Sequence, residues 1–230
     1  GKKAGGNELD KRRECPSGLK HTIHLENFSK ECLKLPLQGK RAHVIQMEEG
    51  QITTKDLVCQ VPGEKEFEAD QEFNKIAVIE RHKGTGRTGV GILSGFGLRG
   101  GAIASSVSHD SHNIIVVGDN DADMELAVNE LVRTQGGYTI VENGAVSMTL
   151  ALPIMGLMSD AGYENVNATL KKMLAKAHQM GVPKGMEPFI TLSFMALPVI
   201  PQLRITPRGL FSVSEFCLLD TIRNGEDNGN

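Results

Sequence analysis

Between residues 74 and 119 the chain consists of short runs of β-branched and other apolar residues separated by glycines. The runs are NKIAVIERH at 74–82, VGILSGF at 90–96, GAIASSV at 101–107 and NIIVVGD at 113–119. Short runs that are apolar at nearly every position are typical of strands buried on both faces. This stretch therefore predicts the strands of a buried sheet, which other elements must cover.

Helical periodicity replaces this pattern at residues 119–135. The apolar residues there recur on one face of a helix, at Met124, Ala127, Val128, Leu131 and Val132. Asn120 or Asp119 can cap the first turn, because short polar side chains accept hydrogen bonds from its free N–H groups. The glycines at 136 and 137 then end the helix.

Further elements follow towards the carboxyl end. Residues 138–152 predict a β-hairpin, with Asn143-Gly144 as its type I′ turn. A second helix is predicted near residues 164–180, because apolar residues again share one face and a glycine follows. Residues 189–203 and 210–216 are predicted to be apolar strands or short buried segments.

Together these elements predict an α+β fold, in which a mixed β-sheet is covered by two or more helices and preceded by a short β-rich segment. We divide the chain into a disordered or loosely ordered tail at 1–18, a β-rich segment at 19–68, the α+β domain at 69–218 and a flexible tail at 219–230. The segment 19–68 is thin for a domain of its own, and we expect it to be the remnant of a small β-domain.

Charge and composition argue against several classes of partner. The net charge is −3, and the 230 residues include two Tyr, eight Phe and no Trp. Such a chain lacks the basic surface and stacking groups that bind nucleic acid or an anionic membrane. No apolar run approaches the roughly 20 residues that span a bilayer. The cysteines are scattered without a CxxC pair, at Cys15, Cys32, Cys59 and Cys217, which favours reduced thiols and a cytoplasmic location.

Polar, chemically able side chains crowd between the runs at 101–107 and 113–119. They are Ser105, Ser106, His109, Asp110, His112 and Asn113. Loops between buried strands concentrate binding and catalytic groups, because the scaffold fixes them while the backbone stays accessible. We expect the functional site here, with Arg81 and His82 as further candidates at the end of the run at 74–82.

These residue types permit several chemistries. They can donate and accept hydrogen bonds, or relay protons, for a polar heterocycle, or they can satisfy one another as structural groups. His109 and His112 are the candidates for a metal site, although residues three apart on a strand face opposite sides and chelate only through a turn. A Ser-His-Asp triad within one loop is disfavoured, because neighbouring residues seldom adopt its geometry.

Residues 84–89, GTGRTG, match the G-x-G-x-x-G pattern of phosphate-binding loops. Such a loop opens a helix whose N-terminal amides face the phosphates. The residues that follow, VGILSGFGLRGG, have no helical periodicity. A glycine-rich turn between strands is therefore the favoured interpretation.

Several longer blocks resemble a known family. They include KIAVIERHKGTG, GFGLRGGAIASSVSHDSHNIIVVGDNDADM and LPIMGLMSD. These blocks resemble the C-terminal portion of the bacterial adenine deaminases, which belong to the metal-dependent amidohydrolase superfamily. The likeness extends from about residue 19 to about residue 216 and is dense in the middle.

The resemblance implies hydrolysis of adenine to hypoxanthine and ammonia, in purine salvage or catabolism. It also implies a (β/α)₈ barrel that holds a divalent metal, manganese or iron. The H-x-H pair that begins the metal ligands of such a barrel does not occur in this chain. We therefore expect a domain that follows the barrel, has no deaminase activity alone, and helps to enclose the purine with residues 109–113.

Other readings stay open beside this one. The chain could be a structural or oligomerisation module of the barrel protein, or a stand-alone domain that binds a small ligand or a metal. We expect adenine and the barrel domain as partners in the complete enzyme, and a homo-oligomer. No cofactor is assigned to this chain itself.

Overall fold

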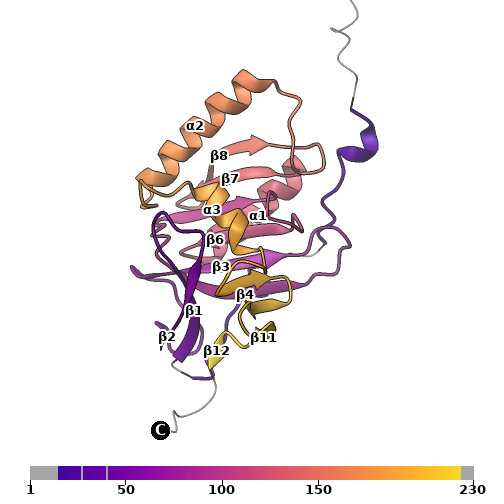
Figure 1. Ribbon diagram of the computed structural model, residues 1–230. Coiled ribbons are helices and arrows are strands. Elements are labelled where there is room, and N and C mark those ends of the chain that lie inside the picture. Colours follow the sequence, from indigo (N-terminus) through magenta and orange to yellow (C-terminus); the bar gives the residue numbers. More distant parts are fainter. Residues whose placement is uncertain (1–14, 27, 40, 224–230) are drawn as a thin grey trace, which may run out of the picture.

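The computed structural model describes residues 15–26, 28–39 and 41–223 (Figure 1). Of the tails predicted at 1–18 and 219–230, residues 1–14 and 224–230 lie outside this part, whereas residues 222–223 of the second tail form a strand that pairs with residues 41–42. Within the described part, nine strands form one sheet in the order β12-β1-β4-β3-β6-β5-β7-β8, with β2 also paired to β1. The strands are β1 (Arg41–Met47), β2 (Thr54–Gln60), β3 (Phe73–Ile79), β4 (Thr88–Ser94), β5 (Gly101–Ser105), β6 (Ile114–Gly118), β7 (Gly137–Glu142), β8 (Ala145–Ala151) and β12 (Ile222–Arg223).

A smaller sheet and the helices complete the described part of the chain. The smaller sheet has the order β11-β10-β9. Its strands are β9 (Leu203–Thr206), β10 (Gly209–Ser212) and β11 (Cys217–Leu219). The helices are α1 (Asp121–Thr134), α2 (Tyr163–Gln179) and α3 (Pro188–Met195), and two short 3₁₀ helices, η1 (Ser17–Leu19) and η2 (Lys30–Leu33), precede the sheet.

The large sheet is mixed. Strands β1 and β4 run parallel, with Val44 opposite Ile92, whereas the other neighbouring strands run antiparallel. Residues 19–68 supply β1 and β2, and β1 lies between β2 and β4. The amino-terminal strands therefore share one sheet with the strands that follow.

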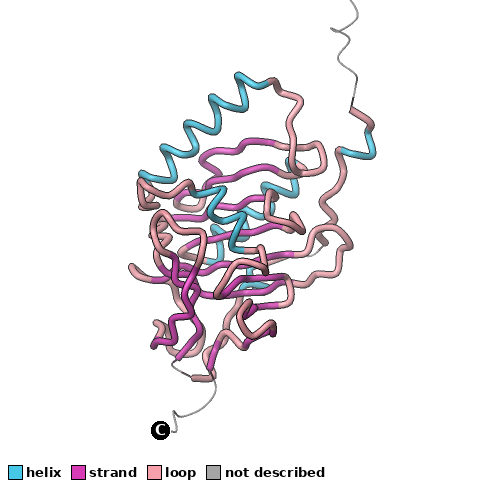
Figure 2. Tube along the Cα trace, in the orientation of Figure 1, coloured by secondary structure: helices cyan, strands magenta, loops and turns pink. Residues whose placement is uncertain are grey.

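Strand β3 shows how the sheet is buried on both faces. Every one of its positions is buried, and its side chains alternate between two cores, as strand geometry requires. Ile76 and Val78 share one core with α2 and α3, whereas Ala77 and Ile79 share the other with α1. Helices thus cover both faces of the sheet, and the tube in Figure 2 shows these helices around the central strands. The predicted α+β fold with a mixed sheet is confirmed.

Helix α1 begins and ends where its sequence predicts. Asn120 caps it, accepting a hydrogen bond on its side-chain oxygen from the Asp123 N–H at 2.8 Å. The helix ends before Gly136, with Gln135 in the left-handed conformation. The predicted apolar face is buried at Met124, Ala127, Val128 and Leu131.

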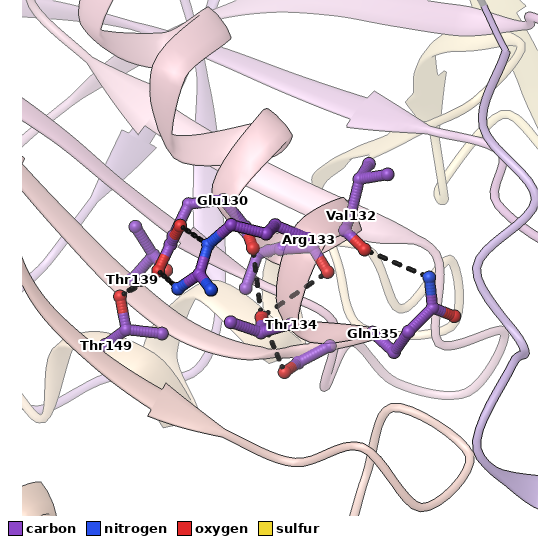
Figure 3. A network of polar contacts seen from close by, with 9 residues as sticks. Glu130, Val132, Arg133, Thr134, Gln135, Thr139 and Thr149 are labelled. Atoms are coloured by element: carbon purple, nitrogen blue, oxygen red, sulfur yellow. Dashed lines mark hydrogen bonds and ion pairs between the residues drawn. The ribbon is translucent and has the colours of Figure 1, made fainter.

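A polar network fixes the last turn of α1 against the hairpin (Figure 3). Glu130 accepts two hydrogen bonds of 2.7 Å from Arg133 and one of 2.8 Å from the Thr149 hydroxyl on β8. The hydrogen bonds from Arg133 are the main cause that lowers the pKa of Glu130. Thr134 donates to the Glu130 carbonyl at 3.0 Å. The Glu130 carboxylate is therefore charged and is paired with the Arg133 guanidinium, although Glu130 is buried.

Both predicted turns occur. Asn143 and Gly144 have φ values of +49° and +80°, as a type I′ hairpin turn requires. Residues 84–87 lie in the connection between β3 and β4, and residues 88–89 begin β4, which pairs antiparallel with β3. No helix follows them directly, so the phosphate-loop reading lacks the structure that it needs.

The segment 189–203, predicted as an apolar strand or a short buried segment, begins with a helix. Residues 188–195 form α3, in which Phe189, Leu192 and Met195 are buried, so the first alternative fails for this part and the second holds. Glu187 caps this helix and Pro188 occupies its first turn, but the segment between them and Met195 is apolar almost throughout, so its sequence shows no helical contrast. In the described part of the chain, no helix is both long and apolar enough to cross a membrane.

Candidate functional site

The predicted site residues lie at one end of the large sheet. Residues 107–113, called the HDSHN loop below, connect β5 to its antiparallel neighbour β6. Arg81 and His82 lie just after β3, which ends at Ile79 and also pairs with β6. The strand order therefore brings all the predicted residues into one region, although they come from separate parts of the sequence.

His109 is held against helix α3. Its ring stacks on that of Phe194 with centroids 5.4 Å apart, and its backbone N–H donates to the Ser193 carbonyl at 3.0 Å. The side chain of His109 remains 41% exposed, and that of Asp110 is 87% exposed. The HDSHN loop thus presents an imidazole and a carboxylate to solvent while its backbone is fixed.

His112 turns the loop back towards the sheet. Its φ of +50° lies in the left-handed region, and its Nδ1 accepts a hydrogen bond from the Ser108 N–H at 3.3 Å. Burial lowers the pKa of His112, and the positive charge that His109 can carry lowers it further. A neutral ring whose Nδ1 is an acceptor carries its proton on Nε2, which is then a hydrogen-bond donor.

Arg81 joins three segments of the chain beneath the loop. It is 1% exposed, and its guanidinium donates to the carbonyls of His112, of Thr22 at 3.1 Å and of Met155 at 3.0 Å. None of the described carboxylates forms an ion pair with it. Burial lowers the pKa of Arg81 to about 10, which leaves it charged at neutral pH. Its contacts are those of a positioning residue rather than of a ligand-binding residue.

The hydroxyl groups of the two serines that precede the loop also form hydrogen bonds within the domain. Ser105 Oγ donates to the Val107 carbonyl at 3.0 Å. Ser106 Oγ donates to the Gly156 carbonyl at 2.6 Å and accepts from the Gly137 N–H at 2.8 Å. Both serines are fully buried. Their hydroxyl groups therefore fix the path of the backbone into the loop.

Asn113 and His82 brace the other end of the loop. Asn113 Oδ1 accepts from the Arg81 N–H at 3.3 Å, and its Nδ2 donates to Ser111 Oγ at 3.0 Å. His82 Nε2 donates to the Ser111 carbonyl at 2.7 Å. These hydrogen bonds hold the Asn113 and His82 side chains within the domain, whereas the side chains of His109 and Asp110 remain 41% and 87% exposed.

A groove of about 340 Å³ lies beside the loop. On one side it is lined by Asp110, Ser111 and Asn113, and on the other by residues 196–199 and 206–207. Sequence reasoning missed this second wall, which contains Pro198 and Pro207. The prolines signal turns after α3 and after β9, but nothing in the local sequence places those turns against the loop.

A family model described as adenine deaminase C-terminal domain matches residues 51–217 of the chain. The chain belongs to the adenine deaminase C-terminal domain family. The HDSHN loop and both walls of its groove lie inside the matched range, so the site described above is part of this adenine deaminase domain.

Curated relatives named adenine deaminase agree with this assignment. The relative from Desulfitobacterium hafniense is 50% identical over 204 residues, which cover 88% of this chain and 36% of the relative. The relative from Bacillus subtilis is 46% identical over 192 residues, which cover 82% of this chain and 33% of the relative. The chain therefore spans about a third of the length of these adenine deaminases.

The residues of this adenine deaminase domain do not fit a metal centre. No group of three or more His, Cys, Asp or Glu side chains in the described residues could hold a metal ion. His109 Nδ1 lies 3.8 Å from the carboxylate of Asp110, and the Nδ1 of His112 already accepts a backbone hydrogen bond. The loop can therefore donate and accept hydrogen bonds, but its histidines do not assemble a ligand set.

Proposed function

We propose that this domain completes an adenine deaminase, and that its HDSHN loop lies over the mouth of a catalytic barrel and helps to enclose the purine. The observation that carries the proposal is the contrast within the loop. Its backbone is fixed by buried groups, Arg81 above all, whereas the side chains of His109 and Asp110 are 41% and 87% exposed. A fixed backbone that carries solvent-exposed polar side chains is the arrangement that a preorganised binding loop needs.

The loop side chains match the chemistry of a purine. Adenine offers ring nitrogens that accept hydrogen bonds and N–H groups that donate them. Neutral His112 can donate from Nε2, and the Asp110 carboxylate can accept. A loop that closes over the ring also excludes water, which strengthens the polar interactions inside the site.

The proposal assigns the divalent metal, manganese or iron, to the barrel, because the described residues of this chain do not fit it. This chain alone is then expected to leave adenine unchanged. The proposal also includes a cytoplasmic, homo-oligomeric enzyme that acts in purine salvage or catabolism.

Reconstitution tests whether deamination needs both this domain and the barrel. Ammonia release from adenine, with manganese supplied, is measured for this chain, for a separately produced barrel portion and for the two together. We expect activity only when both are present. Ammonia release by this chain alone would show a catalytic centre within it and would overturn the proposal.

Substitution in the complete enzyme tests the loop. His109→Ala and His112→Ala are expected to lower kcat/KM for adenine at least about tenfold, because the purine is held less well. Metal content is expected to stay unchanged. His21→Ala removes an exposed histidine outside the loop and serves as the matched control. Full activity in both loop variants would contradict the proposed role.

A second candidate function is a structural module that never touches the substrate. The buried hydrogen bonds of Ser105, Ser106 and Arg81 favour it, because these three side chains bind carbonyl groups of the domain itself. Under this alternative, the loop variants change the free energy of unfolding and leave kcat/KM unaltered.

A further inference from the structure

An apolar groove lies on the small sheet, next to the one beside the HDSHN loop. It has a volume of about 510 Å³, and its walls include Pro198, Val199, Pro207, Phe211, Phe216 and Leu218. Phe216 is 80% exposed and Val199 is 69% exposed. Large apolar side chains gathered in one exposed groove mark an interaction site more often than an ordinary surface.

Phe216 is presented by an unusual backbone conformation. Its φ is +54°, a region that bulky residues rarely adopt. The residue lies in the turn between β10 and β11, where Ser212 pairs with Cys217 and the Ser212 hydroxyl accepts from the Glu215 N–H at 3.2 Å. The ring meets Phe211 edge to face, with centroids 5.5 Å apart. The turn thus holds an aromatic ring at the surface, beside a second one.

The apolar groove is continuous with the groove of the loop. Pro198, Val199, Thr206 and Pro207 line both of them. A partner that covers Asp110 from this side therefore also meets the apolar groove.

Positive charge exceeds negative charge among the residues that line the apolar groove. Arg87 and Arg208 line it together with Glu80, and no described carboxylate forms an ion pair with either guanidinium. Glu80 instead accepts hydrogen bonds from the N–H groups of His82 and Thr85 in its own turn, at 2.6 and 3.1 Å. The groove therefore suits a partner with apolar side chains in its centre and carboxylates at its edge.

The parts of the sequence outside the described structure do not have this chemistry. Residues 224–230, NGEDNGN, contain no apolar side chain, and residues 1–14, GKKAGGNELDKRRE, contain one large apolar residue, Leu9. The relatives, by contrast, continue for about two thirds of their length beyond the part that this chain matches, since the match covers 36% of the Desulfitobacterium hafniense protein.

We infer that the groove formed by Val199, Phe211, Phe216 and Leu218 is the docking surface for the barrel portion of adenine deaminase, which seats an apolar, acid-flanked segment there. The inference rests on the proposed function, because it takes the barrel portion as the partner. It extends that function by naming the surface through which the domain, and with it the HDSHN loop, is held against the barrel.

Thiol labelling measures whether the groove is covered. Val199→Cys places a thiol in the groove with little change in volume. The native Cys217 is exposed and neighbours Leu218 on a strand, so the two side chains point to opposite faces; Cys217 is the internal control. Alkylation by iodoacetamide at each position is followed by peptide mass spectrometry, in this chain alone and in a complete deaminase polypeptide that carries this domain.

We expect the introduced thiol to react at least about tenfold more slowly in the complete polypeptide, because a covered group reacts only after local opening. Cys217 is expected to react equally in both. Equal rates for the introduced thiol would overturn the inference. Slowing in this chain alone that increases with its concentration would also overturn it, since the groove would then pair two copies of the domain.

The same samples separate this inference from the proposed function. Protection of the groove in a polypeptide that releases no ammonia from adenine would retain the docking surface and reject the deaminase role. A polypeptide that releases ammonia from adenine but leaves the groove unprotected would retain the deaminase role and reject the docking surface. Phe216→Ser provides a second variant, expected to weaken association of this chain with a separately produced barrel portion, whereas Tyr163→Ser, at a residue of α2 that is 76% exposed, is expected to leave association unchanged.

Discussion

The ring of His109 stacks on the ring of Phe194 at a centroid distance of 5.4 Å and an interplanar angle of 27°. One residue belongs to the HDSHN loop and the other to α3, so this contact ties a partly exposed histidine of the loop to a helix that packs on the sheet. The position of the loop therefore depends on α3 as well as on the strands that it connects.

A double-mutant cycle measures this contact. Phe194→Leu, His109→Ala and the double variant are compared by urea unfolding. Stacked ring pairs contribute about 0.5–1.5 kcal/mol beyond the area that they bury, so we expect a coupling free energy of about 1 kcal/mol between the two positions. Additive effects of the two substitutions would show that the rings do not stabilise one another.

Arg81 is expected to be the most sensitive charged residue of the site. Arg81→Met leaves the carbonyls of Thr22, His112 and Met155 without their donor. Unsatisfied buried groups each cost about 1–3 kcal/mol, so the free energy of unfolding should fall by at least about 3 kcal/mol. Arg208→Met, at an exposed arginine, should change it by less than about 0.5 kcal/mol. A small effect at Arg81 would show that water satisfies the carbonyls.

Gly156 is expected to tolerate no side chain, because it lies against Arg81. Its φ is +70°, and an added Cβ would lie 3.0 Å from the guanidinium. Gly144, at φ +80°, has open space around the same position. Both Gly→Ala variants carry the backbone penalty of about 1 kcal/mol, and Gly156→Ala should lose at least about 1 kcal/mol more. If thermal or urea unfolding showed that the two variants lose the same free energy of unfolding, a steric clash with Arg81 would be contradicted.

The titration of His112 predicts how stability depends on pH. Its pKa is lowered in the folded protein, chiefly by burial, so the unfolded chain binds the proton more tightly. The contribution to stability is then complete above the ordinary pKa of about 6.5 and is lost as the pH falls through the lower, folded value. His112→Asn, which suits the left-handed φ, should flatten that part of the stability curve. If His112→Asn left the dependence of stability on pH unchanged between pH 7 and 5, the lowered pKa of His112 would be contradicted.

The sequence predicts the elements whose evidence is local. Strands β3 to β8, α1 and the turn at Asn143-Gly144 follow from periodicity and from glycine positions, and the HDSHN loop stands out by its composition. The structure places that loop between β5 and β6. Whether it contacts a purine stays a prediction.

What the sequence does not show depends on contacts between distant residues. Arg81 bonds to carbonyls 31, 59 and 74 residues away, so its role emerges only when the three segments meet. Helix α3 lacks the polar side of an amphipathic pattern, because Ile190 is one of its few exposed positions. Phe216 looked like part of a buried segment, yet its turn holds it at the surface.

Strand β1 has a consequence for how this domain can be inherited. The family match begins at residue 51, whereas β1 ends at Met47 and supplies Val44 and Ile45, which are 0% exposed. A gene fusion or exchange that joined at the family boundary would leave β4 with an open, apolar edge, and open edges recruit other chains. The unit that must stay together to keep this sheet edge covered is therefore longer than the stretch that the family model matches, and recombination at residue 51 should yield aggregates.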